Sequence, residues 1–215
     1  MDWSSLPPEL IDRIACGLLD TADLDCYMAF RAVCHNWRAA TDDPRSDATD
    51  PRFRPRRWFM LSNRTDGDGR RFLNLSPGAS ARVDLPELSR HHLEASTEGL
   101  LLLRDKASHA VRLLNPLTRQ LTSLPDATTL QYTASSQQRT SGYTLKFLQV
   151  FGAGLADDTT VALHFGGTWL ATAKPGDKQW TRLHHIWDNM IIATLPFAGR
   201  FYCVTEKAIM VLDTS

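Results

Sequence analysis

The sequence predicts an α+β multidomain protein in which a small helical segment precedes a larger all-β domain built from repeats. Three observations predict this order. Apolar side chains recur at helical spacing before residue 41, a stretch rich in proline and charge follows, and from Trp58 onward short apolar runs are broken by Gly, Pro, Asp and Asn. We therefore expect helices in residues 1–41, a linker in residues 42–57 and β-strands in residues 58–215.

Composition narrows the class of protein. The chain has 215 residues, 24 Lys and Arg against 24 Asp and Glu, and 43% hydrophobic residues. Balanced charge gives no reason to expect nucleic acid or a membrane as partner, and the apolar content is enough for a buried core. The N-terminus lacks the pattern of a signal peptide, and no apolar run approaches the ~20 residues of a membrane helix. The four cysteines form no regular disulfide framework. We expect a reduced, soluble, intracellular protein of the cytoplasm or nucleus.

Residues 6–18 have the pattern of an amphipathic helix. Pro7 and Pro8 suit a first helical turn, where a missing backbone N–H costs nothing. An apolar stripe recurs at every fourth residue, made by Leu6, Leu10, Ile14 and Leu18. With the later Val33 and Trp37, these are more large apolar groups than so small a helical unit can bury alone. We therefore expect part of this surface to contact another protein.

The segment from Trp3 to Ala40 resembles an F-box. The pattern of that family is Leu-Pro-x-Glu-Leu, an Ile near the end of the first helix, Asp-Leu, and Val-Cys-x-x-Trp-Arg. This chain has "LPPEL" from Leu6, then Ile14, then Asp-Leu at 23–24, and "VCHNWR" from Val33. F-boxes of this family bind the Skp-type adaptor of a cullin-RING ubiquitin ligase. The resemblance implies that the adaptor-binding residues are Trp3, Leu6, Pro7, Leu10, Ile14, Val33, Cys34 and Trp37. The alternative is that these residues are only the internal core of a small helical cap.

Cys34 and His35 raise the question of a metal or catalytic site. Neighbouring side chains on a helix point about 100° apart, so this pair is badly placed to share a metal, and no second pair follows at ligand spacing. No motif activates Cys34 as a nucleophile. We therefore predict no metal and no cofactor, and we expect Cys34, Cys16 and Cys26 to be small buried hydrophobic residues.

The second part of the chain repeats itself. The segments 111–124 and 169–183 align without a gap from Pro116 and Pro175 onward, so that "RQLTSL" matches "KQWTRL". A third copy begins at Gly199, which matches Gly99, and ends at the turn before its last strand. The strand from Lys207 to Leu212 therefore lacks its repeat partner, and an unpaired apolar strand can pair with another chain.

Strand pairs that recur every few tens of residues predict a β-propeller-like array. The length after Trp58 allows about three blades, so we expect an incomplete propeller. This part resembles the F-box-associated propeller-like domain of plant F-box proteins, catalogued as domain of unknown function 295. The resemblance rests on "DPRFRPRRW", "LLNPLTRQLTSLP" and "GRFY". It implies a short or truncated plant F-box protein.

Two other features have structural alternatives. The arginines of the linker, Arg52, Arg54, Arg56 and Arg57, are either a nuclear localisation or acidic-partner site or the ion-pair partners of Asp42, Asp43, Asp47 and Asp50. The histidine pairs at 91–92 and 184–185 lie at strand ends without a carboxylate cluster at fixed spacing, so we interpret them as structural.

The motifs together predict a non-catalytic receptor subunit. The helices would bind a Skp-type adaptor, and through it a cullin, while the β domain would hold a protein target that the sequence does not identify. One alternative is a truncated F-box protein that binds the adaptor without delivering a target. The other is an enzyme with a propeller active site, which the lack of any convergent catalytic motif disfavours.

Overall fold

The computed structural model describes residues 3–21, 24–46, 50–61, 69–75, 78, 80–131, 149–165, 169–183 and 190–214. They fall into two compact units. Unit 1 contains residues up to Asp84 together with 98–100 and 115–120, and unit 2 contains residues 85–97, 101–114 and those from Leu121 onward. The ranges 1–41, 42–57 and 58–215 stay predictions of functional domains.

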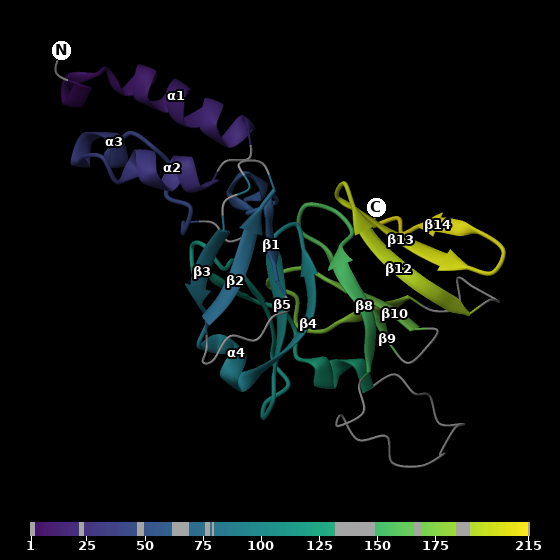
Figure 1. Cartoon of the computed structure of the whole chain (residues 1–215). Coiled ribbons are helices and arrows are strands. Elements are labelled where there is room, and N and C mark those ends of the chain that lie inside the picture. Colours follow the sequence, from purple (N-terminus) through teal and green to yellow (C-terminus); the bar gives the residue numbers. More distant parts are fainter. Residues whose placement is uncertain are drawn as a thin grey trace. The chain divides into compact units, whose positions relative to one another are not determined.

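Unit 1 begins with the helices that the sequence predicts (Figure 1). They are η1 (Trp3–Ser5), α1 (Pro8–Asp20), α2 (Leu24–Arg31) and α3 (His35–Ala39), followed by η2 (Pro51–Phe53). As expected, α1 starts in its Pro-Pro pair, with Pro7 preceding the first turn. The core of the helices is formed by Ala15, Leu19, Leu24, Tyr27 and Phe53. No helix among the described residues is long and apolar enough to cross a membrane.

The strands of the described residues form four small sheets. Sheet I consists of β1 (Trp58–Met60), β2 (Gly69–Asn74) and β3 (Ser80–Asp84) and lies in unit 1. Sheet II consists of β4 (His91–Thr97), β5 (Leu100–Asp105), β6 (Val111–Leu114) and β7 (Leu121–Ser123), preceded by α4 (Glu87–Arg90) and followed by η3 (Ala127–Gln131). Sheet III consists of β8 (Val150–Leu155), β9 (Val161–Phe165), β10 (Trp169–Ala173) and β11 (Thr181–Leu183). Sheet IV consists of β12 (Ile191–Phe197), β13 (Arg200–Thr205) and β14 (Ile209–Val211).

The expected number of about three blades is therefore wrong, because the described residues form four sheets. The estimate assumed roughly 45 residues for each blade. The described residues give sheets I and IV three strands each, and three strands need fewer residues than a four-stranded blade.

The internal repeat inferred from the sequence is confirmed by strand register. Leu113 pairs with Thr122 in sheet II, and Thr172 pairs with Thr181 at the aligned position of sheet III. The third copy keeps the same register, since Tyr202 pairs with Val211 as Leu102 pairs with Leu113. Sheets II, III and IV are thus copies of one antiparallel unit.

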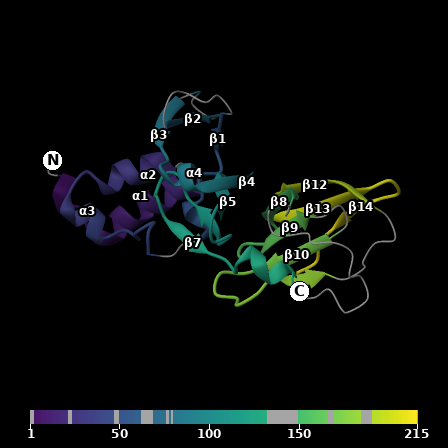
Figure 2. The ribbon, with the colours of Figure 1, turned by 90° about the horizontal axis from the view of Figure 1, so that it is seen from below.

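Sheets III and IV of unit 2 pack face to face. Figures 1 and 2 show β8 and β12 side by side. A side chain at Gly152 would collide with Thr194, and one at Gly154 would collide with Pro196, so glycine lets the two strands approach closely. The core between the sheets contains Ala156, Ala162, Leu170, Ile191, Phe201, Cys203 and Leu212.

The prediction that Cys16 and Cys26 are buried is wrong. Both thiols are exposed, Cys34 is half-buried, and only Cys203 among the four cysteines is buried. The inward face of α1 is taken by Ile11, Ala15 and Leu19, which leaves Cys16 on an outward face of the same helix. Burial raises the pKa of Cys203 to about 11, as expected for a thiol packed among apolar side chains.

Equivalent two-residue turns join the first two strands of sheets II and IV. Glu98 and Gly99 have φ of 49° and 80°, and Ala198 and Gly199 have φ of 50° and 69°. Both turns thus have the positive φ values of a type I′ hairpin, which glycine favours. The two glycines differ in their surroundings, since a side chain at Gly99 would collide with the carbonyl of Pro55, whereas Gly199 faces open space.

Asp157 ties the turn between β8 and β9 to the C-terminal tail. Its carboxylate accepts hydrogen bonds from the backbone N–H groups of Thr159 and Thr160, each at 2.7 Å, and from the hydroxyls of Thr160 at 2.6 Å and Thr214 at 2.7 Å. Burial alone would raise the pKa of Asp157. The hydrogen bonds from Thr160, Thr159 and Thr214 outweigh that effect and hold the pKa well below its usual range.

We predict that Gly99→Ala destabilises the protein more than Gly199→Ala. Both substitutions force alanine into positive φ, at a cost of about 1 kcal/mol. Only Gly99→Ala adds a collision with backbone, so its total cost should exceed about 2 kcal/mol. Urea unfolding of the two variants measures the difference, and equal losses of stability would contradict the close approach of the Pro55 carbonyl to Gly99.

We predict that Asp157 makes unit 2 sensitive to acid. A carboxylate with a lowered pKa in the folded state contributes stability above its unfolded pKa of about 3.9, and the contribution is lost as pH falls through the folded pKa. Asp157→Asn should therefore cost on the order of 2 kcal/mol at pH 7, and its deficit relative to the natural chain should shrink below about pH 4.

Thermal unfolding between pH 7 and pH 3 tests the prediction for Asp157. Asp158→Asn is the matched control, because Asp158 lies in the same turn but is exposed. A deficit for Asp157→Asn that is independent of pH would show that the carboxylate charge is not the stabilising element.

Candidate protein-interaction surface

The first helix has two apolar faces, and only one of them is covered. Ile11 is 1% exposed and belongs to the inward face of α1. Leu10 and Ile14, one turn apart, are 44% and 45% exposed. Among the described residues, none covers these two side chains. A helix face with exposed large apolar side chains is typical of a surface that a partner buries.

The eight residues implied as adaptor-binding all lie at the surface or near it. Trp3 and Val33 are each 60% exposed, and Leu10, Ile14 and Pro7 are exposed as well. The other three are half-buried and are Leu6, Cys34 and Trp37. An exclusively internal role does not fit the exposed members of the set, while their contact with an adaptor stays a prediction.

Trp37 joins the N-terminal segment to α3. Its indole Nε1 donates a hydrogen bond to the carbonyl oxygen of Trp3 at 3.0 Å, and the Asn36 side chain donates to the carbonyl of Ser4 at 3.1 Å. The Trp37 ring also stacks on Phe30, with 4.3 Å between ring centroids. These contacts fix residues more than thirty positions apart in the sequence beside one another, so Trp3 and Trp37 form one patch.

Arg31 fastens the end of α3 to α2, a role that the sequence interpretation missed. Arg31 is buried, with 8% of the residue exposed. Its Nη1 donates to the Thr41 hydroxyl at 2.8 Å and to the carbonyl of Asp42 at 2.6 Å, and it also contacts the Thr41 carbonyl. Tyr27, one turn earlier on α2, donates from its hydroxyl to the same Asp42 carbonyl at 2.7 Å. The spacing of Tyr27 and Arg31 on one helix face was the available signal.

A hollow of about 430 Å³ adjoins the patch. Its walls come from η1, the start of α1 and α3, and they are formed by Ser4, Ser5, Leu6, Pro8, Ile11, Asn36, Ala39 and Ala40. The wall residues are small or apolar and carry no charge. The hollow can therefore receive an apolar side chain from a partner, as the pockets around interface anchors do.

Three of the four linker arginines, Arg52, Arg54 and Arg56, form ion pairs. Arg52 contacts Asp50 at 2.6 Å and Asp42 at 3.0 Å, as the structural alternative predicted. The hydrogen bond from Arg52 lowers the pKa of Asp50. Arg54 and Arg56 instead contact Glu98, at 2.7 Å and 3.2 Å, a carboxylate that the sequence interpretation did not consider. The role of these arginines in nuclear localisation or in binding an acidic partner stays a prediction.

The histidine pair at 91–92 belongs to a structural arrangement at the start of β4. The Nδ1 atom of His91 lies 2.7 Å from the carbonyl oxygen of Glu87, and the ring is buried. Its Nε2 lies 3.8 Å from the carboxylate of Asp105. Hydrogen bonds from the backbone of Ser108 and Ala107 lower the pKa of Asp105 to about 2, so this carboxylate is already engaged in a turn.

No group of three His, Cys, Asp or Glu residues within the described ranges could hold a metal ion. The second histidine pair, at 184–185, lies outside the described residues.

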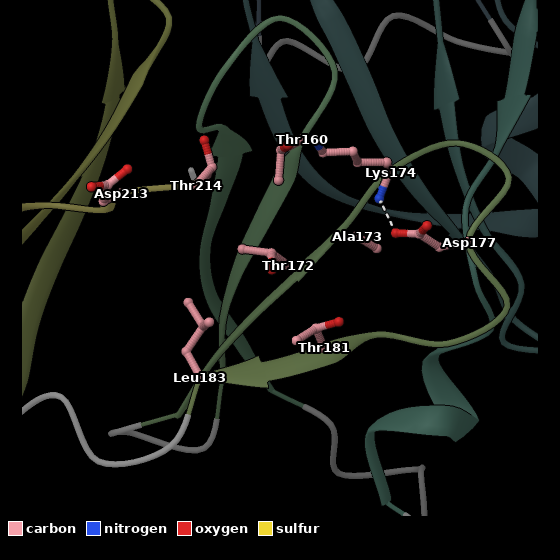
Figure 3. Close-up of a pocket in the computed structure, with 9 residues that line it drawn as sticks. All are labelled: Thr160, Thr172, Ala173, Lys174, Asp177, Thr181, Leu183, Asp213 and Thr214. Atoms are coloured by element: carbon pink, nitrogen blue, oxygen red, sulfur yellow. Dashed lines mark hydrogen bonds between the residues drawn. The ribbon is translucent and has the colours of Figure 1, made fainter.

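A second hollow, of about 390 Å³, lies in unit 2 (Figure 3). Thr172, Thr181 and Leu183 approach it from β10 and β11, and Asp213 and Thr214 approach from the C-terminal tail. Lys174 and Asp177 also line it, and the backbone N–H of Lys174 donates to the Asp177 carboxylate at 2.7 Å. The sequence interpretation had no signal for this hollow, because its walls come from two different repeats.

Two comparisons with known sequences give the family context. A model of the KIB1-4 beta-propeller family matches residues 72–215. F-box protein At4g35733 of Arabidopsis thaliana is 27% identical over 194 residues, which cover 84% of this chain and 50% of that protein. The chain thus spans about half the length of this curated relative. The resemblance to domain of unknown function 295 and the truncation stay predictions.

Solved structures with propeller-like folds show weaker likeness. YCF48 bound to D1 peptide is 14% identical with a TM-score of 0.40, over 68% of this chain and 44% of that chain. YCF48 from Cyanidioschyzon merolae is 11% identical with a TM-score of 0.39, over the same shares. The extracellular domain of the two-component system BT3049 from B. thetaiotaomicron is 14% identical with a TM-score of 0.37, over 74% of this chain and 21% of that chain. Because every TM-score lies below 0.5, we draw no functional inference from them.

The family model covers well over half of the chain, and it includes sheets II, III and IV, whose shared register the structure defines. The chain therefore belongs to the KIB1-4 beta-propeller family.

Proposed function

We propose that this protein is an F-box substrate receptor of an SCF-type cullin-RING ubiquitin ligase. Its helices bind a Skp-type adaptor, and through it a cullin, while its β-sheets hold a target protein. The observation that carries the proposal is the exposed apolar surface of the helices, which we call the helical patch. It includes Trp3, Leu10, Ile14 and Val33, which are exposed at the positions of the F-box pattern, together with the half-buried Trp37.

The chemistry of the patch supports adaptor binding. An interface core is typically apolar, is depleted of charge and contains an aromatic anchor. Trp37 provides a half-buried ring held in place by Phe30 and Trp3, and Leu10 and Ile14 provide exposed aliphatic surface on α1. Arg31 and Tyr27 keep α3 against α2 through Asp42, so the patch is preorganised before a partner arrives.

The relatives support the same proposal. The F-box protein of Arabidopsis thaliana aligns with 84% of this chain, so the alignment extends beyond the 144 residues of the propeller family match. The chain covers only 50% of that relative, so the function of the whole relative does not transfer to it. Delivery of a target by this chain is therefore our proposal.

The proposed mechanism is proximity rather than catalysis. A target tethered beside a ubiquitin-charged enzyme is presented at a high effective concentration, and this requires no chemistry from the receptor. Among the described residues, the perturbed carboxylates Asp105 and Asp157 are both engaged by turn hydrogen bonds, which fits a non-catalytic subunit.

A second candidate function is binding of the adaptor without delivery of a target. Affinity capture followed by mass spectrometry separates the two functions. A receptor captures ubiquitylated clients that depend on Leu10, whereas a competitor captures only the adaptor and cullin.

We predict that Leu10→Asp and Ile14→Asp abolish capture of the Skp-type adaptor. Each places a charge in the middle of an apolar interface, where it has no partner. Cys16→Asp is the matched control, because Cys16 is also exposed on α1 but points away from Leu10 by about 120°. Co-purification with the adaptor measures the effect, and retained capture by both variants with unchanged helicity would refute the proposal.

We predict that Trp37→Ala weakens adaptor binding by about 2 kcal/mol or more, since aromatic anchors dominate interface energies. The same substitution removes the stack on Phe30 and the bond to Trp3, so it also loosens the helices. Trp37→Phe separates the two effects, because it keeps the stacking ring and loses the indole N–H. Calorimetric titration of the adaptor, with circular dichroism of each variant, measures both.

A further inference from the structure

The turn between β6 and β7 is built into the core of the helices. Residues 115–120, which form this turn, belong to unit 1 together with the helices. The side chain of Leu117 packs against the helical core, which is formed by Ala15, Leu19, Leu24, Tyr27 and Phe53. A helical unit of this size buries little apolar surface by itself, so its order depends on each side chain that is added to its core.

Asn115 joins the same turn to the segment that follows the helices. The residue is buried, and its Nδ2 donates a hydrogen bond to the carbonyl oxygen of Phe53 at 2.8 Å. Its Oδ1 accepts the N–H groups of Leu117 at 3.1 Å and of Thr118 at 3.2 Å. One buried amide therefore shapes the turn and also satisfies a carbonyl that would otherwise be left without this donor.

Two further contacts fix the segment after α3 to turns of sheet II. The Nε of Arg45 donates to the carbonyl of Thr118 at 3.1 Å, and the side-chain amide of Gln120 donates to the carbonyl of Arg45 at 3.1 Å. In the turn between β4 and β5, Glu98 contacts the buried guanidinium of Arg54 at 2.7 Å. The segment is thus held at both ends by groups of unit 1 that come from sheet II.

The equivalent turn of sheet III shows what is special about the turn of sheet II. In the repeat alignment, Leu117 corresponds to Gly176 and Asn115 corresponds to Lys174. A side chain added at Gly176 would have open space around it. The N–H of Lys174 bonds only within its own turn among the printed contacts of that turn, to the carboxylate of Asp177. The two residues that contact the helical module in sheet II therefore have no counterparts in sheet III.

The contacts of the turn continue through the helical core to the helical patch. The ring of Phe53, whose carbonyl accepts from Asn115, lies 5.6 Å from the ring of Tyr27. Phe30 also packs against this core, and it stacks on Trp37 with 4.3 Å between ring centroids. A contiguous set of packed side chains thus connects the turn with the aromatic ring of the patch.

We infer that the turn 115–120 is a structural part of the adaptor-binding module and that Asn115 and Leu117 are positioning residues for adaptor binding. Neither residue has to contact the adaptor. Loss of their contacts lowers the fraction of chains whose helices are ordered for binding, and the apparent affinity falls with that fraction. The coupling is reciprocal, so a bound adaptor also holds the turn in place. The inference rests on the proposed function where it names the adaptor.

The first test is the affinity of a purified Skp-type adaptor for full-length variants, measured by biolayer interferometry. Asn115→Asp keeps an oxygen for the N–H groups of Leu117 and Thr118 but has no N–H for the carbonyl of Phe53. We expect the adaptor to bind this variant at least about fivefold more weakly than the natural chain. Asp177→Ala, which opens the equivalent turn of sheet III, is the matched control and should bind within about twofold.

The rates of binding distinguish a positioning residue from a contact residue. Asn115→Asp should lower the apparent association rate and leave the dissociation rate within about twofold, because fewer free chains are ready to bind while the complex is unchanged. Leu10→Ala removes exposed apolar surface of the patch and should mainly raise the dissociation rate. A raised dissociation rate for Asn115→Asp with an unchanged association rate would contradict the positioning role.

Hydrogen exchange of the full chain without adaptor tests the same inference independently of the proposed function. Backbone amides of α1 and α2 should exchange faster in Asn115→Asp than in Asp177→Ala or the natural chain. Leu117→Gly, which gives the turn the residue found in sheet III, should act in the same direction and serves if Asn115→Asp does not fold. Thermal melting of each variant checks that the fold is retained.

The outcomes separate the two proposals. Failure of the natural chain to bind the adaptor refutes the proposed function, and the exchange of the helical amides still decides whether the turn orders the helices. Helical amides that exchange equally in the natural chain, Asn115→Asp and Leu117→Gly would overturn the inference. With adaptor added to the natural chain, slower exchange at the amides of Leu117 and Thr118 is the expected reciprocal effect, and unchanged exchange would contradict the coupling.

Discussion

The face-to-face packing of successive sheets is the constraint on which unit 2 depends. Each small antiparallel sheet has an apolar face that must be kept from water, and packing against the next sheet covers it. Gly152 and Gly154 allow the closest approach by accepting Thr194 and Pro196 where a side chain would collide. The cluster around Phe201 and Cys203 then closes the core between sheets III and IV. On the opposite face of β12 from Thr194 and Pro196, Leu195 and Phe197 are 57% and 66% exposed.

The helices meet the same constraint on a smaller scale. In unit 1, Phe53 and Tyr27 pack with Ala15, Leu19 and Leu24 in the core of the helices. The ring centroids of Phe53 and Tyr27 lie 5.6 Å apart. Nothing in the described residues covers the outward face with Leu10 and Ile14. Burial of one stripe is enough to fix the helices, and the polar contacts of Arg31 with Asp42 and Thr41 fix their ends. The outward stripe is then available for binding without cost to the fold.

The sequence was sufficient to predict the elements and their alignment wherever a pattern was periodic or repeated. The alignment of Pro116 with Pro175 predicted which residues occupy equivalent strands, and the register of Leu113 and Thr172 confirmed it. The start of α1 in its Pro-Pro pair followed from backbone chemistry alone. The predicted stripe of α1 was real, but periodicity could not decide that Leu10 and Ile14 would face outward while Ile11 and Ala15 faced inward.

Other features were not predictable because they depend on contacts between distant residues. Glu98 forms ion pairs with Arg54 and Arg56, which lie more than forty positions earlier in the sequence, and no local pattern predicts such a pair. Cys16 and Cys26 were expected to be buried because cysteine usually is, yet neighbouring residues on their helices took the inward positions. The predicted number of about three blades was wrong for a related reason. No sequence signature distinguishes a sheet of three strands from part of a sheet of four.

The helical patch offers side chains and a hollow, so its selectivity for a partner depends on shape and on the exclusion of charge. The fold itself fixes this surface, because Trp37 is bonded to Trp3 and Arg31 is bonded to the carbonyl of Asp42. A surface that is ordered before binding loses little conformational entropy when a partner arrives. Such a surface suits a constant partner better than a variable one, because a change in any of these contacts would also change the packing of the helices.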